Sequence, residues 1–196
     1  MIIPEKFEAI KKQLIQKLTL NLPKEFYYHG VRHTMDVFEQ SIRIASAENI
    51  TNELDLQLLK LASLYHDSGF LVTYDGHEEA SCEIVKKDLS GFDISEENID
   101  WICGMIMATK IPQLPLNHLE RIICDADLDY LGRDDFFTIS KSLYRELKKR
   151  GKVKTIKDWN QVQVIFFKQH FYFTKTNKHT REHIKARHLS IIEASL

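Results

Sequence analysis

Apolar residues recur at helical spacing along most of the chain, and short breaks rich in Pro, Gly or Asn separate the runs. No segment has the alternation of β-branched residues that is typical of a strand. The pattern predicts an all-α fold, a single-domain bundle of about eight helices over residues 1–196. An aromatic-rich stretch lies at 157–173, and the predicted helices span 4–20, 28–48, 52–67, 75–89, 95–110, 117–131, 134–150 and 177–196.

Local start signals support several of these helices. Thr51 or Asn52 can cap the third helix, because their side chains accept hydrogen bonds from free backbone amides. Capping boxes are predicted where a capping residue precedes an acid by three positions, at 75–78 and 117–120. The break at 151–157 is the only candidate domain boundary, and it is too short for a linker.

The third predicted helix carries the most informative polar pair. Its apolar residues between Leu54 and Tyr65 cover nearly the whole circumference, which is typical of a helix buried on all sides. His66 and Asp67 follow at its end. An imidazole and a carboxylate in an apolar interior need a partner, because unpaired burial is costly. A metal ion is the simplest partner, provided that other segments supply further ligands.

Composition narrows the classes of function. The chain has 196 residues, 43% of them hydrophobic, and a net charge of −1, so neither a nucleic-acid polymer nor an anionic membrane is expected as a partner. No apolar run has transmembrane length, and the start lacks the pattern of a signal peptide, so we expect a cytoplasmic protein. The three cysteines, which are typical of a reduced core, are Cys82, Cys103 and Cys124.

Two further polar clusters could meet the His-Asp pair. His29 and His33 are four residues apart and share a helix face. The other cluster is Asp125, Asp127 and Asp129. A rotation of about 100° per residue places Asp125 outside the apolar stripe, whereas Asp127 and Asp129 flank it on opposite edges. Spacing alone does not choose between these two. The stripe itself consists of Leu119, Ile122, Ile123, Ala126 and Tyr130.

Together these segments resemble a known superfamily. The motifs Tyr28-His-Gly-Val-Arg-His33, Tyr65-His-Asp-Ser-Gly69 and Asp125-Ala-Asp-Leu128 occur in the order found in the HD-domain superfamily of metal-dependent phosphohydrolases. The resemblance covers about residues 25–135. It implies an HD-type helical domain, on which we expect the helices of 134–196 to pack.

The resemblance implies a ligand set of two imidazoles and two carboxylates. These are His33, His66, Asp67 and Asp127, the last because the family motif places the ligand in Ala-Asp-Leu. Such a mixed set suits one divalent ion of manganese, zinc, iron, cobalt, nickel or magnesium. The ion would lower the pKa of a bound water and offset charge on a phosphoryl group.

Three residues are predicted to take part in catalysis. Asp67 is one of them. His29 resembles the histidine that protonates the leaving oxygen in the cyclic-nucleotide phosphodiesterase branch, although Gly30 replaces the usual Asn. The alternative for His29 is a hydrogen-bonded histidine beside the cleft. His77 could touch the substrate or a second metal. Branches with two metals carry a histidine near residues 107–110, and its absence here predicts a single metal.

Other charged and aromatic residues are less specific. Lys110, Arg133 and Arg145 are candidate phosphate-binding cations, and each taken singly is also typical of a solvated surface. His179, His183 and His188 lie among basic residues, so we predict a surface helix there. The aromatic residues of the C-terminal third are typical of a core or a homodimer contact, and they include Trp159, Phe166, Phe167, Phe171, Tyr172 and Phe173.

Two hypotheses of different classes follow. The first is a phosphohydrolase that acts on a small phosphorylated metabolite, in particular a nucleotide monoester or cyclic diester. The second is a metal-binding HD domain that serves signalling or ligand binding with little turnover. Retention of all four ligands favours the enzyme, since a scaffold does not need them. The missing histidine near Thr109 disfavours a two-iron oxygenase.

Overall fold

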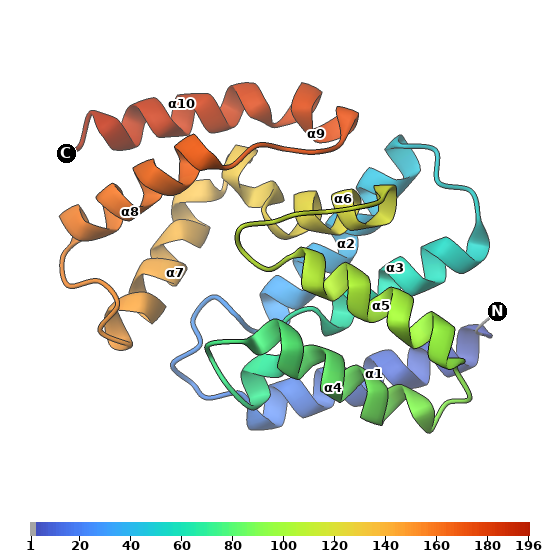
Figure 1. The fold of residues 1–196 in the computed structure, drawn as a ribbon. Coiled ribbons are helices and arrows are strands. Elements are labelled where there is room, and N and C mark those ends of the chain that lie inside the picture. The colour runs from blue at the N-terminus through green and yellow to red at the C-terminus, as the bar shows by residue number, and fades with distance from the viewer. Residues whose placement is uncertain (1–2) are drawn as a thin grey trace.

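Residues 3–196, the part of the chain that this computed structural model describes, fold into ten α-helices and two 3-10 helices without a strand (Figure 1). The all-α prediction is confirmed. Two helices exceed the predicted eight, because the aromatic stretch is itself helical and the last predicted helix is divided. The elements are α1 Pro4–Asn21, α2 Val31–Ala47, α3 Glu53–Tyr65, η1 Ser68–Leu71, α4 His77–Ser90, α5 Glu96–Ala108, α6 His118–Asp127, η2 Asp129–Gly132, α7 Phe136–Lys149, α8 Ile156–Gln169, α9 Lys175–Thr180 and α10 Glu182–Glu193.

The first six α-helices enclose the larger core, and α3 lies inside it. Asn52 caps α3 by accepting from the amides of Leu54 and Asp55 at 2.9 and 3.1 Å. Every residue from Leu58 to Tyr65 except Lys60 is buried, whereas residues 54–57 are half-buried. The all-round burial predicted from Leu54 onward is therefore confirmed for the part that starts at Leu58. Because α3 is packed by α2, α5 and α6, its C-terminal end, with His66 and Asp67, stays in the interior of the molecule.

The remaining helices build a second, smaller core beside the first. Residues of η2, α7, α8 and α10 meet in it, and α10 lies along α8 (Figure 1). The aromatic stretch supplies part of this core, since Trp159 and Phe167 are buried. The buried members of the second core are Tyr28, Leu128, Tyr130, Leu131, Phe136, Phe167 and Ile192.

Two acids of the 125–129 cluster attach the C-terminal third to the first core. Asp125 accepts from the amides of Phe173 and Thr174 at 2.8 and 2.9 Å, and from the Thr174 hydroxyl at 2.6 Å. Asp129 accepts from Arg43 at 2.6 Å and from Arg181 at 2.9 Å. Asp125 lies outside the predicted stripe and is nevertheless fully buried, because the segment before α9 covers that side of α6.

Three local predictions fail wholly or in part. At 117–120, Asn117 caps α6, but the Glu120 carboxylate accepts from the amide of Leu116 and not from that of Asn117, so the box is not closed. Asp75 and Glu78 do not form a capping box, because the residue that precedes α4 is Gly76, which has a left-handed backbone (φ 77°) and no side chain to cap the helix. The C-terminal helix is not wholly a surface helix either. His188 is buried, stacks on Phe136 and hydrogen-bonds the carbonyl of Leu131 at 2.9 Å.

None of the helices among the described residues is both long enough and apolar enough to cross a bilayer.

Candidate metal centre and adjoining cavity

Three helices bring four potential ligands to one place. His33 lies in the first turn of α2, His66 and Asp67 follow α3 directly, and Asp127 is the last residue of α6. The Nε2 atom of His33 lies 3.1 Å from Asp127 Oδ1 and 3.3 Å from His66 Nε2. The Oδ2 atom of Asp67 lies 3.4 Å from His33 Nε2 and 3.3 Å from His66 Nε2.

These separations suit a shared ion. Ligand atoms roughly 2.1 Å from one metal lie roughly 3.0–3.4 Å apart when they subtend angles between octahedral and tetrahedral values. The separation of His66 Nε2 from Asp127 Oδ1, at 3.7 Å, is longer, and Asp67 lies outside the group whose ligand atoms are all within 4.8 Å of one another. Two imidazoles and a carboxylate, those of His33, His66 and Asp127, therefore form a group able to hold a metal ion.

The chemistry of the donors points the same way. The Ser63 carbonyl accepts from His66 Nδ1 at 2.9 Å, which fixes the ring and directs Nε2 at His33. Asp67 Oδ2 is buried and has no hydrogen-bond partner. Although burial opposes a charged ring, the Asp67 and Asp127 carboxylates raise the pKa of His66 to about 9. Acidic oxygens and imidazoles thus converge where a cation is favoured.

The chain after Asp67 is anchored by a close contact with α4. A Cβ on Gly69 would lie 1.9 Å from the His77 carbonyl oxygen, so a larger residue has no room there. The Ser81 hydroxyl accepts from the Gly69 amide at 2.7 Å and donates to the His66 carbonyl at 2.8 Å. This network holds the His66-Asp67 backbone against the first turns of α4, next to His77.

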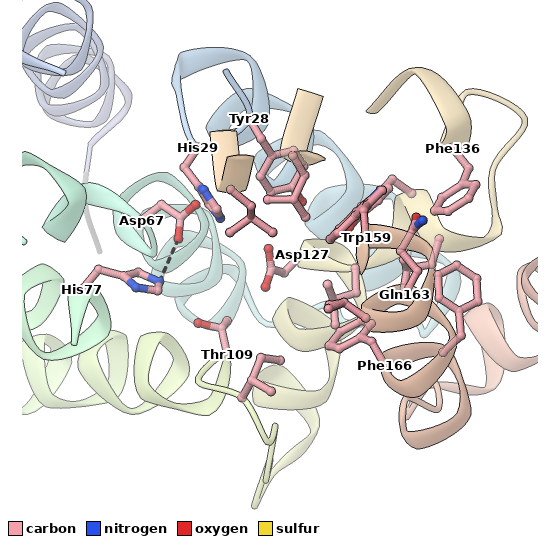
Figure 2. A pocket seen from close by; sticks show the side chains of 18 of the residues that line it. Tyr28, His29, Asp67, His77, Thr109, Asp127, Phe136, Trp159, Gln163 and Phe166 are labelled. Carbon is pink, nitrogen blue, oxygen red and sulfur yellow. Dashed lines mark ion pairs between the residues drawn. The ribbon is translucent and has the colours of Figure 1, made fainter. Parts of the chain in front are cut away.

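His77, at the start of α4, contacts the same carboxylate from outside the cluster. Its Nε2 lies 3.4 Å from Asp67 Oδ1, an ion pair drawn in Figure 2. Although burial opposes a charged ring, the hydrogen bond with Asp67 raises the pKa of His77 above its ordinary value. The ring of Phe70 stacks on His77 at 4.0 Å between centroids, and its distance to the ring of His29 is 4.4 Å. Phe70 therefore packs against both histidines.

His29 is held by an acid that our sequence reasoning missed. Glu146 on α7 is fully buried, and its Oε1 lies 2.5 Å from His29 Nδ1. Its Oε2 accepts from the amides of Tyr28 and His29 at 2.9 and 3.2 Å. Although burial opposes ionisation, these contacts lower the pKa of Glu146. One signal was present, since Glu146 keeps helical spacing with the core residues Phe136 and Leu143.

A cavity of about 270 Å³ adjoins the cluster (Figure 2). Its polar end is lined by His29, Asp67, His77 and Asp127. The opposite end, which we call the apolar arm, lies between η2, α7 and α8, and its principal residues are Leu131, Phe136, Leu143, Trp159, Val162 and Phe166. The C-terminal third, in which the sequence shows no motif, thus forms a wall of the candidate site.

The three candidate cations lie outside this cavity lining. Lys110 pairs with Glu79 at the surface. The Arg133 guanidinium donates to Asp36 at 2.7 Å, and that of Arg145 lies over the ring of Tyr27. The structure therefore brings His29, His77 and the predicted ligands together, and it directs these cations to other partners.

Comparisons with known proteins agree with this geometry. The HD domain family matches residues 30–129, just over half of the chain, including all four predicted ligands. A protein of Lactobacillus plantarum, solved as a structural genomics target, has the same fold with a TM-score of 0.70 and 17% identity, over 100% of this chain and 98% of its own. No curated protein matches the sequence. The chain belongs to the HD domain family.

Proposed function

We propose that this protein is a metal-dependent phosphohydrolase that releases phosphate from a small phosphorylated metabolite. One observation carries the proposal. The group formed by His33, His66 and Asp127, with Asp67 Oδ2 beside it, adjoins a cavity that Asp67 and Asp127 line together with His29 and His77. A site built for structure alone is expected to be closed by protein ligands, whereas a catalytic site keeps access for substrate.

His33, His66, Asp67 and Asp127 would hold the metal. When bound, the metal supplies an acidic water and offsets negative charge on the phosphoryl group. Glu146 favours a proton on His29 Nδ1, which leaves Nε2 of that ring for the leaving oxygen of the substrate. His77 holds Asp67 Oδ1 through its Nε2 atom, while its Nδ1 atom lies 3.3 Å from the Tyr74 carbonyl oxygen, so we propose that His77 positions this carboxylate.

The substrate class that we propose is a phosphate ester, with nucleotide monoesters and cyclic diesters as the first compounds to test. The family resemblance supports this choice, and a single metal is part of the proposal.

We also propose a cytoplasmic location. The three cysteines are free thiols, as expected in a reducing compartment.

The first experiment measures phosphate release and metal content together. Purified protein with added Mn²⁺ should hydrolyse 4-nitrophenyl phosphate or at least one member of a nucleotide panel. Asp127→Ala should lose this activity and bind Mn²⁺ at least about 100-fold more weakly, because it removes a ligand rather than a neighbour of one. The exposed Asp134 offers a matched control, and Asp134→Ala should behave as wild type.

Two outcomes would contradict the proposal. Stoichiometric metal binding without phosphate release from any substrate would favour an HD domain that binds ligands or signals without turnover. Unchanged metal binding in Asp127→Ala would show that the ligand set is wrong.

A further inference from the structure

The cavity is divided by the chemistry of its walls. Asp67 and His77 lie at one end in Figure 2, Asp127 lies between, and Trp159 and Phe166 lie at the other end. The apolar arm therefore begins directly beside the metal centre. A molecule bound at the metal would extend its organic part into this arm.

Polar groups within the arm satisfy one another. The Ser140 hydroxyl donates to Gln163 Oε1 at 2.6 Å and accepts from Trp159 Nε1 at 3.2 Å. Gln163 Nε2 donates to Asn160 at 3.2 Å. These bonds fix the Trp159 ring and leave the arm with a mainly apolar surface. Burial of a charged group there is costly, whereas an apolar ring or chain gains from leaving water.

The charges of the residues that line the cavity limit the number of phosphate groups that a substrate can carry. Among the described residues that line the cavity, none is Lys or Arg, and the charged ones besides the histidines are Asp67, Glu78 and Asp127. Outside the lining, the guanidinium of Arg150 lies over the rings of Phe26 and Tyr74. A di- or triphosphate chain in the arm would meet aromatic carbon instead of the cations that such chains require.

We infer that the preferred substrate is a phosphate monoester of an uncharged aromatic or apolar group. The single phosphate lies at the metal end, beside His29 and His77. The organic group fills the arm, where Trp159, Val162 and Phe166 determine specificity. This inference rests on the proposed function and narrows it. A nucleotide would qualify only with one phosphate, its base placed in the arm.

Kinetics with matched substrates tests the inference. With Mn²⁺, kcat/KM should be at least about tenfold higher for 1-naphthylmethyl phosphate than for glycerol 3-phosphate, since both are esters of primary alcohols and apolar contacts discriminate by about 10- to 200-fold. ATP should likewise be a poorer substrate. Val162 is 44% exposed at the rim, so Val162→Glu should fold, and it should raise KM for the naphthylmethyl ester at least about tenfold. KM for glycerol 3-phosphate should rise far less, because its short chain does not fill the arm.

The control comes from the same helix. Ile165 is 58% exposed and lies outside the cavity lining, so Ile165→Glu should leave all these values unchanged. A preference for ATP, or an equal loss for both monoesters in Val162→Glu, would overturn the inference.

A binding measurement separates this inference from the proposed function. Naphthylmethyl phosphonate, which resists hydrolysis, should bind the Mn²⁺-loaded protein in calorimetry and bind Val162→Glu at least about tenfold more weakly. If it does so while no substrate is hydrolysed, the proposed activity fails and the arm remains a binding site for apolar phosphates. If substrates are hydrolysed but Val162→Glu binds the phosphonate as wild type does, the inference fails and the activity stands.

Discussion

At the scale of single residues, the buried pair of His29 and Glu146 allows a direct test of catalytic positioning. Glu146→Gln keeps an oxygen for the amides of Tyr28 and His29, but it removes the negative charge beside the imidazole. We expect kcat to fall about 10- to 100-fold, with KM and Mn²⁺ affinity unchanged, because the His29 ring would lose the carboxylate that orients it toward the leaving group. Steady-state kinetics and metal titration measure these quantities.

A double variant tests whether the fall in kcat in Glu146→Gln acts through His29. Combining His29→Ala with Glu146→Gln should cost no more than His29→Ala alone, since the two residues act as one unit. A parallel loss of stability and KM, or additive losses in kcat, would indicate that Glu146 is only structural.

The aspartates at 125, 127 and 129 show which contacts the spacing of residues along a helix can predict and which it cannot. Helical rotation left Asp127 and Asp129 as equal candidates, and only the family resemblance separated them. In the structure Asp127 faces the two imidazoles, whereas Asp129 is bound by Arg43 and Arg181. Those arginines are distant in sequence, so the pairing depends on how the helices pack, which spacing does not report.

At the scale of elements, the junction of α8 and α10 contains a histidine that makes stability depend on pH. His170 follows α8, and the Lys185 ammonium of α10 donates to its carbonyl at 2.7 Å. Burial, and then the nearby Lys185 charge, lower the pKa of His170 to about 3. In the unfolded chain the ring titrates near 6.5, so between about pH 6.5 and 3 the unfolded state binds the extra proton.

Acid should therefore lower the contribution of this junction to the free energy of unfolding, whereas His66, with its pKa raised to about 9, contributes in the opposite direction. Between pH 7.5 and 5.5, His170 should account for a loss of about 1.4 kcal/mol in the free energy of unfolding. Urea denaturation of wild type and His170→Gln at both pH values measures how the free energy of unfolding changes on acidification. This change should be about 1.4 kcal/mol less unfavourable in the variant. His179→Gln is an exposed control and should retain the wild-type difference. An equal pH dependence in His170→Gln would contradict this assignment.

Helix ends were predictable where a side chain formed the cap. Asn52, Ser95 and Asn117 cap α3, α5 and α6 through their own oxygens, and each helix begins where the sequence indicates. The boundary at Leu128, where α6 gives way to η2, has no such local signal. That break follows the attachment of Asp125 and Asp129 to the C-terminal segment, a tertiary effect that overrides the helical pattern.

At the scale of the whole molecule, the site is shared between the two cores. The motifs that predict the metal ligands lie mainly in the first core, although Tyr28 and Leu128 at their ends pack in the second, and the family resemblance of these motifs predicted the cluster. The walls of the apolar arm come from α7 and α8, which contribute ordinary aromatic and aliphatic residues at helical spacing. Residues of these types at helical spacing are typical of a hydrophobic core in any helix. The arm could therefore be recognised only from the way in which the helices pack in the structure.

A metal ion at the proposed site should stabilise the entire fold, because the residues proposed to hold it come from α2, the end of α3 and α6. At a free Mn²⁺ concentration of 100 times Kd, binding to the folded state alone adds about 2.7 kcal/mol. For a chain of this length we expect the Tm to rise about 5–10 °C over that in EDTA. Calorimetry with and without Mn²⁺ measures the shift. Asp127→Ala should show almost none and Asp134→Ala the full shift, because only the first removes a ligand. An undiminished rise in Asp127→Ala would place the metal elsewhere.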